Sequence, residues 1–195
     1  MTEEVTYDQL IDVLYSEDQR YRESSHQFQE DLKEPTAWLP AFLALMWLTG
    51  ARVSETLAIR GQDIKPMEQE GRQVVVVSLM NLKQRHNATK ESIVVPDQYP
   101  VAWAYVENYL AQLENPNGLM FHKSRVAVWQ HCKRIFDLGT HRVGRHSWVM
   151  NQARRGAQIL DVKQMGGWSR LQSMDPYIHK FGRKELVKRM LEQKD

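Results

Sequence analysis

Two arginines, an indole and a late tyrosine are the side chains in this sequence whose types and spacing suit chemistry on a phosphodiester. Arg145 begins a predicted helix, Trp168 follows 23 residues later, and Tyr177 lies nine residues further on. Arg52 stands far upstream, in the segment Thr-Gly-Ala-Arg-Val-Ser-Glu. Each guanidinium offers a planar fork of donors that matches two phosphate oxygens, and an indole N–H is a donor only. A phenol becomes a covalent nucleophile when neighbouring cations favour its anion, so this set could grip a phosphodiester and attack it.

The elements that must position these residues are mostly helices. Two β-branched runs, 74–79 and 92–95, predict a small antiparallel hairpin or meander with a polar loop between them, and 119–121 is a further short strand candidate. Helices are predicted over residues 5–16, 37–49, 54–60, 99–114, 125–137, 145–155, 158–165 and 184–193. The predicted fold class is therefore mostly α with a small antiparallel β-sheet, an α+β fold.

Charge divides the chain unevenly. Residues 1–35 hold three Lys/Arg against ten Asp/Glu, whereas residues 140–195 hold 12 Lys/Arg against five Asp/Glu. We expect an acidic N-terminal helix and linker over 1–35 and a main domain over 36–195. The basic C-terminal third suits a polyanion such as DNA, although charge alone fits a solvated helical surface equally well. The acidic arm would lie either on this basic part or on a partner.

Composition excludes several classes of protein. No apolar run is long enough to span a membrane, and the acidic start Met-Thr-Glu-Glu is no secretory signal. Cys132 is the only cysteine, which excludes an internal disulfide and a cysteine zinc cluster. His141 and His146 are five residues apart and do not share a helix face, and no phosphate-binding glycine loop is present. We therefore expect a cytoplasmic protein with no metal and no small-molecule cofactor.

The chain resembles the catalytic domain of the tyrosine recombinases, the phage-type integrases, over about residues 36–180. One motif is the segment around Arg52 and Glu55, which continues to Asp63-Ile64. The other is Arg145-His146-Ser147, then Gly156, then Met165-Gly-Gly-Trp168, then Tyr177. Either motif alone would be weak, but both occur in order with a hairpin between them. The resemblance implies the tyrosine recombinase catalytic-domain fold and cleavage of double-stranded DNA through a 3′-phosphotyrosine.

The resemblance also assigns roles to these residues. Arg52 and Arg145 would bind the scissile phosphate, with Glu55 orienting Arg52 or supporting the local fold. Trp168 would donate its indole N–H to a non-bridging oxygen while packing against the tyrosine segment. Tyr177 would be the nucleophile.

Two positions stay open. A lysine in the turn between the strands would protonate the leaving 5′ oxygen; Lys83 is the first choice and Lys90 the rival. The family usually has histidine three residues before the second arginine, but Arg142 stands there and His141 is displaced by one. Either Arg142 replaces the histidine, or a local kink brings His141 in. Arginine cannot accept a proton, so in the first case His146 would be a supporting donor or base.

The resemblance implies self-association into a tetramer on DNA. Only about 35 residues precede the match, too few for the DNA-clamping domain that full recombinases carry, so the chain is either a catalytic fragment or a natural minimal recombinase. A topoisomerase-like relaxing activity would use the same chemistry. The alternative class is a non-catalytic relative that binds DNA through a helix-turn-helix-like segment, with Arg154 and Arg155 on phosphates.

Overall fold

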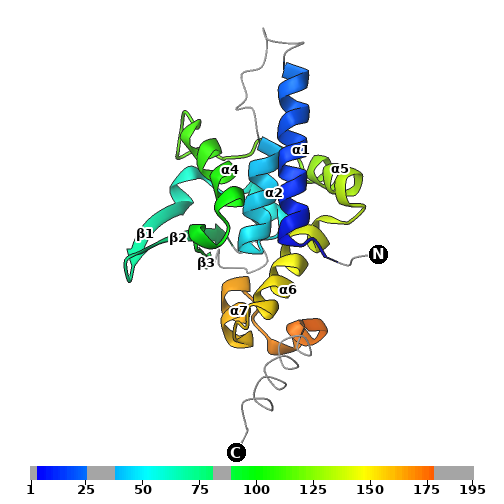
Figure 1. Ribbon diagram of the computed structural model, residues 1–195. Coiled ribbons are helices and arrows are strands. Elements are labelled where there is room, and N and C mark those ends of the chain that lie inside the picture. The colour runs from blue at the N-terminus through cyan, green and yellow to red at the C-terminus, as the bar shows by residue number, and fades with distance from the viewer. Residues whose placement is uncertain (1–3, 26–37, 81–88, 178–195) are drawn as a thin grey trace, which may run out of the picture.

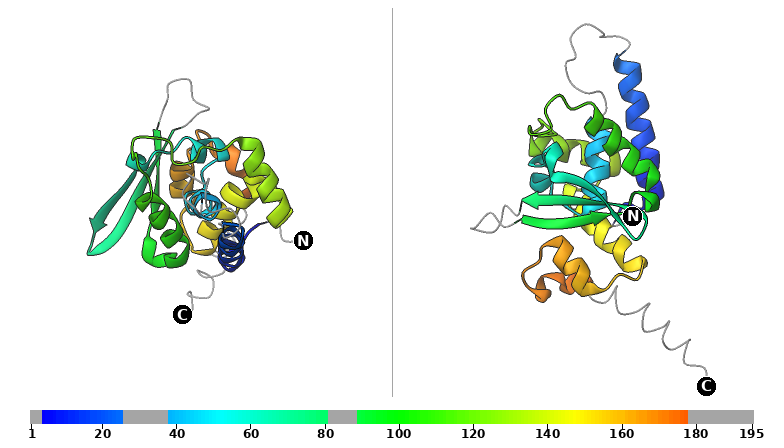
Figure 2. Two further views of the ribbon diagram at one scale, coloured as in Figure 1. Left: turned by 90° about the horizontal axis from the view of Figure 1, so that it is seen from above. Right: turned by 90° about the vertical axis from the view of Figure 1, so that its left-hand side faces the viewer.

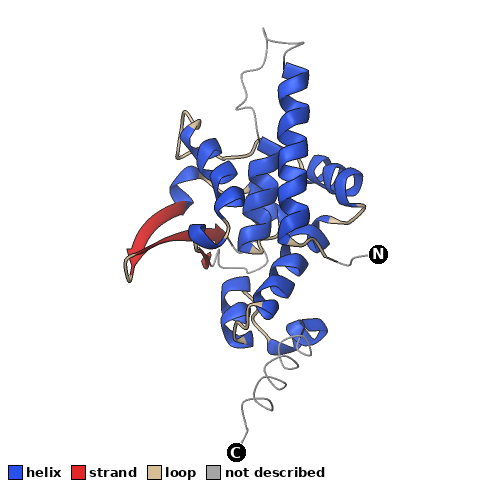
Figure 3. Cartoon of the chain, viewed as in Figure 1, coloured by secondary structure: helices blue, strands red, loops and turns tan. Residues whose placement is uncertain are grey.

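A computed structural model describes residues 4–25, 38–80 and 89–177. Helices dominate, and one small sheet stands out from them (Figure 3). The longer helices are α1 (Tyr7–Ser25), α2 (Trp38–Thr49), α4 (Pro100–Ala111), α5 (Arg125–Phe136), α6 (Ser147–Arg154) and α7 (Ile159–Gly166). The short helical turns are α3 (Val53–Leu57), η1 (Gly61–Asp63), η2 (Pro96–Gln98), η3 (Arg142–His146) and η4 (Leu171–Met174). No helix among these described residues is both long and apolar enough to cross a membrane.

Helix α2 is the centre of the main core. It is apolar on every side, and all residues from Leu39 to Thr49 are buried. Pro40 is tolerated because it lies in the first turn, where backbone N–H groups have no helical partner. The helix ends at Gly50, whose φ of +62° is the left-handed conformation that glycine adopts at little cost. Helices α1 and α4 pack against α2 (Figure 1).

The sheet is a three-stranded antiparallel meander in the order β1 (Ile64–Gln69), β2 (Arg72–Met80) and β3 (Thr89–Val94). Strand β2 alternates, so that Val75, Val77 and Leu79 face the core. The predicted hairpin is thus confirmed as a meander, with β1 as an additional strand that was not predicted. The sheet lies at the edge of the helical body (Figure 2). Helices α2 and α7 both contact strand β3 on its buried face, which carries Ser92 and Lys90.

The N-terminal helix belongs to the same core. It was predicted over 5–16, but it continues to Ser25, and its Leu10 and Leu14 are fully buried. Glu17 pairs with Arg134 of α5 at 2.5 Å, and Glu4 pairs with Arg154 of α6. Acidic residues of the arm therefore lie on basic residues of the chain's own body.

A short run of hydrogen bonds ties the start of the described chain to the turn η3. The Val5 N–H donates to Ser147 Oγ at 2.7 Å, and that hydroxyl donates to the Arg142 carbonyl at 2.6 Å. The Trp47 indole N–H donates to the Val5 carbonyl at 2.9 Å. Because Val5 and Ser147 are both buried, these bonds fix η3 against α2.

A second, smaller core lies at the C-terminal end of the described chain. Its buried members are Trp148, Val149, Val162, Met174 and Tyr177, and they come from α6, α7 and the segment that follows α7. The boundary between this cluster and the main core is where the predicted site residues meet.

Candidate active site

Arg52 is held at the start of helix α3 by its own glutamate. The Arg52 N–H donates to Glu55 Oε2 at 2.8 Å, and its guanidinium Nη1 lies 2.5 Å from Glu55 Oε1. A glutamate at the third helical position commonly closes a helix start in this way. Gly50 precedes this start, and a side chain there would come within 2.4 Å of the Trp148 ring. The loop before Arg52 therefore needs glycine for both backbone conformation and space.

Arg145 is a buried guanidinium with only 2% of its surface exposed. It was predicted to begin a helix, but it lies in the preceding π-type turn η3. Its Nη2 donates to the Gly166 carbonyl at 2.5 Å, and its Nη1 lies 3.5 Å from the Gly50 carbonyl. Burial lowers the pKa of Arg145 to about 10, and the charge of Arg52 acts in the same direction. Two cations thus share one partly desolvated region.

Lys90 and Glu55 form a buried ion pair between the two arginines. The Lys90 ammonium lies 2.9 Å from Glu55 Oε2 and donates to the Gly166 carbonyl at 3.1 Å. Burial acts to raise the pKa of the Glu55 carboxyl, but Lys90 and Arg52 together hold that pKa below its ordinary value. Contacts therefore run without a break from Arg52 through Glu55, Lys90 and the Gly166 carbonyl to Arg145.

Trp168 and Tyr177 close the other side of the site. The indole ring of Trp168 stacks on the Arg145 guanidinium, whose central carbon is 3.7 Å from the ring centroid. The Tyr177 ring lies edge-on to Trp168 with centroids 6.3 Å apart and is 5.4 Å from the His146 ring. Burial raises the pKa of the Tyr177 phenol, and the charges of Arg145 and Arg142 oppose that rise only partly. In this DNA-free form the phenol stays protonated at neutral pH.

The π-type turn η3 affects where His141, the histidine displaced by one position, lies relative to Arg145. A π-turn holds one more residue per hydrogen-bonded ring than an α-turn. A residue four positions before Arg145 in such a turn lies close to where an α-helix would put the residue three positions before. Partial burial lowers the pKa of His141, with Arg145, His146, Arg142 and Arg52 adding to the effect. His141 therefore lies within the field of both phosphate-binding candidates.

Arg142 lies on a different part of the same turn. Its Nη1 is 3.4 Å from His146 Nε2, and its charge reaches Tyr177. Arg142 thus contacts His146 and its charge acts on the Tyr177 phenol, whereas the charges of Arg145 and Arg52 act on His141.

Three predicted residues lie outside this group. Lys83 falls in 81–88, beyond the described residues. Arg154 pairs with Glu4, and the guanidinium of Arg155 lies 5.2 Å from the Tyr99 ring centroid. Both arginines of the helix-turn-helix hypothesis therefore contact other residues of the chain itself.

Sequence reasoning missed the Gly166 carbonyl as the atom on which Lys90 and Arg145 converge. A backbone carbonyl leaves no mark in a sequence, but the inward position of Lys90 does. Lys90, Ser92 and Val94 alternate along β3, and all three are buried. Since Val94 is apolar and faces the core, period-two alternation puts Lys90 on the same face.

No protein-family model and no curated protein matches the chain. Solved structures do. The XerH recombinase bound to palindromic difH substrate superposes with a TM-score of 0.59 at 15% identity, covering 90% of this chain and 51% of XerH. XerA recombinase gives 0.57 at 14% identity over 96% of this chain and 62% of XerA. The catalytic domain of bacteriophage HP1 integrase gives 0.54 at 18% identity, covering 76% of this chain and 79% of that domain.

The chain spans about half the length of XerH. At these low identities the likeness concerns the three-dimensional arrangement of the chain. The HP1 match, which covers most of both chains, shows which part of a longer integrase the arrangement corresponds to. The fold predicted from the sequence is confirmed: the chain has the fold of the tyrosine recombinase catalytic domain.

Proposed function

We propose that this protein cleaves and rejoins double-stranded DNA by transesterification at a backbone phosphate. The observation that carries the proposal is the charge of the buried cluster. Arg52 and Lys90 both pair with the Glu55 carboxylate, and Arg145 contacts the Gly50 and Gly166 carbonyls, so these four residues carry three cations against one carboxylate. Buried cations without matching anions are unfavourable, and a phosphate diester would supply the missing charge.

In the proposed reaction the Tyr177 oxygen attacks the phosphorus and the bond from phosphorus to the 5′ oxygen breaks. The products are a 3′-phosphotyrosine and a 5′-hydroxyl. Arg52, Arg145 and Trp168 stabilise the charge on the non-bridging oxygens. Lys83 protonates the leaving oxygen. A 5′-hydroxyl from another strand then reverses the reaction, and the ester conserves the bond energy so that no ATP is needed.

The phenol proton needs an acceptor, and His141 fits this role better than Arg142. An imidazole with a lowered pKa is neutral at pH 7 and accepts a proton, whereas a guanidinium does not. Arg142, beside Tyr177, instead stabilises the phenolate as it forms. The likeness to XerH, which was solved with its difH substrate in pre-cleavage and post-cleavage complexes, supports DNA as the substrate.

The decisive experiment is a covalent trapping assay with Tyr177→Phe. Nicked suicide duplexes made from DNA that flanks the gene would be incubated with wild type and variant and separated on a denaturing gel. We expect a protein–DNA adduct with wild type and none with the variant. Adducts that persist in Tyr177→Phe would reject Tyr177 as the nucleophile. Tight DNA binding by wild type without any adduct would instead support a DNA-binding protein that does not cleave.

The same assay tests the proton path and the assembly. His141→Ala should slow adduct formation more at pH 6 than at pH 9, because hydroxide replaces a missing base as pH rises. We expect copies of the chain to associate on DNA as a tetramer. Sedimentation of the trapped complex on a duplex with two sites measures that number.

A further inference from the structure

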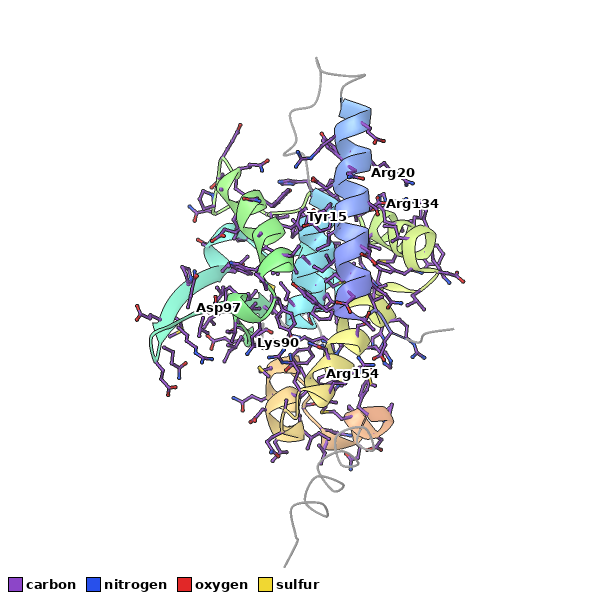
Figure 4. The ribbon with its side chains drawn as sticks, in the orientation of Figure 1. Tyr15, Arg20, Lys90, Asp97, Arg134 and Arg154 are labelled. Atoms are coloured by element: carbon purple, nitrogen blue, oxygen red, sulfur yellow. The ribbon has the colours of Figure 1, made fainter. Side chains whose placement is uncertain are left out.

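Lys90 occupies an unusual place for a lysine. It lies on β3 with 8% of its surface exposed, at the border between the sheet and the helices α6 and α7 (Figure 4). Its ammonium contacts two groups from different segments, the Glu55 carboxylate of α3 and the Gly166 carbonyl at the end of α7. Lysines are almost never this buried unless paired, so the position has a structural or functional purpose.

The Gly166 carbonyl controls the placement of Trp168. It accepts hydrogen bonds from both Lys90 and Arg145. Gly167 then reverses the chain with a φ of +67°, and the Trp168 N–H returns to the Lys163 carbonyl at 3.0 Å. The indole packs so closely on Gly166 that a Cβ there would lie 1.8 Å from the ring. A shift of the Gly166 carbonyl would therefore move the indole that stacks on Arg145.

We propose that Lys90 is a positioning residue whose ammonium bridges Glu55 and the Gly166 carbonyl and so locks Trp168 and Arg145 against the Arg52 half of the site. This role rests on the proposed function only for its effect on DNA cleavage. The bridge itself is a property of the DNA-free protein.

The enclosure of Lys90 separates this role from that of the acid that protonates the leaving oxygen. Only 6% of its side chain is exposed, and its ammonium is directed at Glu55 and Gly166. These contacts use two of the three N–H donors of the ammonium, and bringing the third to a DNA oxygen would require the enclosed side chain to move. Lys83, which lies between β2 and β3 in the sequence, keeps the role of acid.

The bridge has a pH limit. The charged groups that face Lys90 are Glu55, Arg145 and Arg52, and burial lowers its pKa to about 8. Above that pH the ion pair with Glu55 is lost, and cleavage should fall.

The free energy of unfolding should change in the opposite direction. Between about pH 8 and the ordinary lysine value of 10.5, the unfolded chain binds more protons at Lys90 than the folded chain. The Lys90 contribution to stability therefore rises with pH in that window. A loss of cleavage that accompanies a gain in stability is not caused by unfolding.

The test compares Lys90→Met, Lys90→Arg and Lys83→Met on two suicide duplexes. One carries an ordinary phosphodiester and the other has sulfur in place of the leaving 5′ oxygen. A thiolate leaves without a proton, so sulfur restores cleavage when the acid is missing and does not when positioning is lost. We expect sulfur to rescue Lys83→Met and not Lys90→Met. Lys90→Arg should keep most activity and shift the alkaline limit of cleavage to higher pH.

A DNA-free measurement completes the test. Hydrogen exchange of the 159–168 peptide should be faster in Lys90→Met than in wild type, with α2 still protected. Lys65→Met, the same change at an exposed lysine on β1, should leave that exchange unchanged. Sulfur rescue of Lys90→Met, or unchanged exchange at 159–168, overturns the positioning role. If wild type forms no adduct, the proposed function fails while the exchange result still decides the role of Lys90.

Discussion

The two cores of this molecule differ in size and in content. The main core around α2 is built of side chains such as Phe42, Leu45 and Val75, which are fully buried and have no chemistry. The small core of α6, α7 and the following segment includes Tyr177, the proposed nucleophile, among its few buried members. The side chain proposed to react is thus also one of those that hold the smaller core together.

The contrast indicates which part of the molecule opens at the lower free energy. A cluster with few buried side chains opens at a lower free energy than a large core. In the proposed reaction, Tyr177 would have to leave a buried position in which its pKa is raised. The main core, in contrast, fixes Arg52 and, through η3, Arg145. Under the proposed function, the main core would hold the phosphate-binding arginines firmly while the nucleophile lies on the less stable part of the protein.

The largest effects are expected when each core is weakened in turn. Phe42→Ala should lower the free energy of unfolding by about 3–5 kcal/mol, since Phe42 is fully buried and its ring centroid lies 5.0 Å from that of Phe121. Val162→Ala in the small core should cost roughly 1–2 kcal/mol. Urea unfolding measures both. Amide hydrogen exchange should become faster throughout the protein for Phe42→Ala and only over α6 and α7 for Val162→Ala. Faster exchange throughout the protein in both variants would mean that the two cores unfold as a single cooperative unit.

The next effect concerns the border between the cores. Arg145→Lys keeps the charge but loses the fork that reaches the Gly166 carbonyl and stacks on Trp168. We expect adduct formation to slow by about 10²–10³-fold, the usual cost of removing one donor from a charge-stabilising site. Arg134→Lys on α5 is the matched control and should be near wild type. An Arg145→Lys rate close to wild type would mean that charge alone suffices.

A smaller effect is expected where α7 ends. Gly166→Ala places a methyl against the Trp168 ring and should cost about 1–3 kcal/mol, as overpacking does. It should also slow cleavage, because the indole moves off Arg145. Gly139→Ala is the control, since nothing lies within 4 Å of a Cβ there. Chemical denaturation and the trapping gel give the two readouts, and a neutral Gly166→Ala would show that the ring has room to shift.

The smallest change in stability is expected for a surface ion pair, the one between Glu17 and Arg134. Glu17→Gln removes the pair with Arg134, whose side chain is 40% exposed, and should change the free energy of unfolding by less than about 1 kcal/mol. Thermal unfolding at low and high salt measures it. A larger loss would show that the acidic helix is held by charge and not by Leu10 and Leu14.

Much of the fold could be predicted because several elements carry strong local signals. Helix α2 is an apolar run that ends at a glycine, and α5 begins at Ser124, whose Oγ accepts the Ala127 N–H at 3.1 Å. Strand β1 was missed because it is an edge strand with only Ile64 buried, so it shows no apolar alternation. Helix α1 was predicted too short, since its second half is polar.

The candidate site was predictable only as a set of side chains. Motif spacing indicated that Arg52, Arg145, Trp168 and Tyr177 meet, and the structure brings them together. The π-type turn and the bridge through the Gly166 carbonyl depend on backbone geometry, which residue types do not encode. The role of His141 therefore became arguable only from the turn η3.

The bonds at Val5 have a practical consequence for anyone who rebuilds this polypeptide. The backbone of Val5 links Trp47 to Ser147, because its carbonyl accepts from the Trp47 indole and its N–H donates to the Ser147 hydroxyl. The same hydroxyl donates to the Arg142 carbonyl. Joining the main domain to a new leader or fusion partner would have to preserve these bonds. Without them, the segment that carries Arg145 loses an anchor some 140 residues away in the chain, although no residue of the candidate site has been altered.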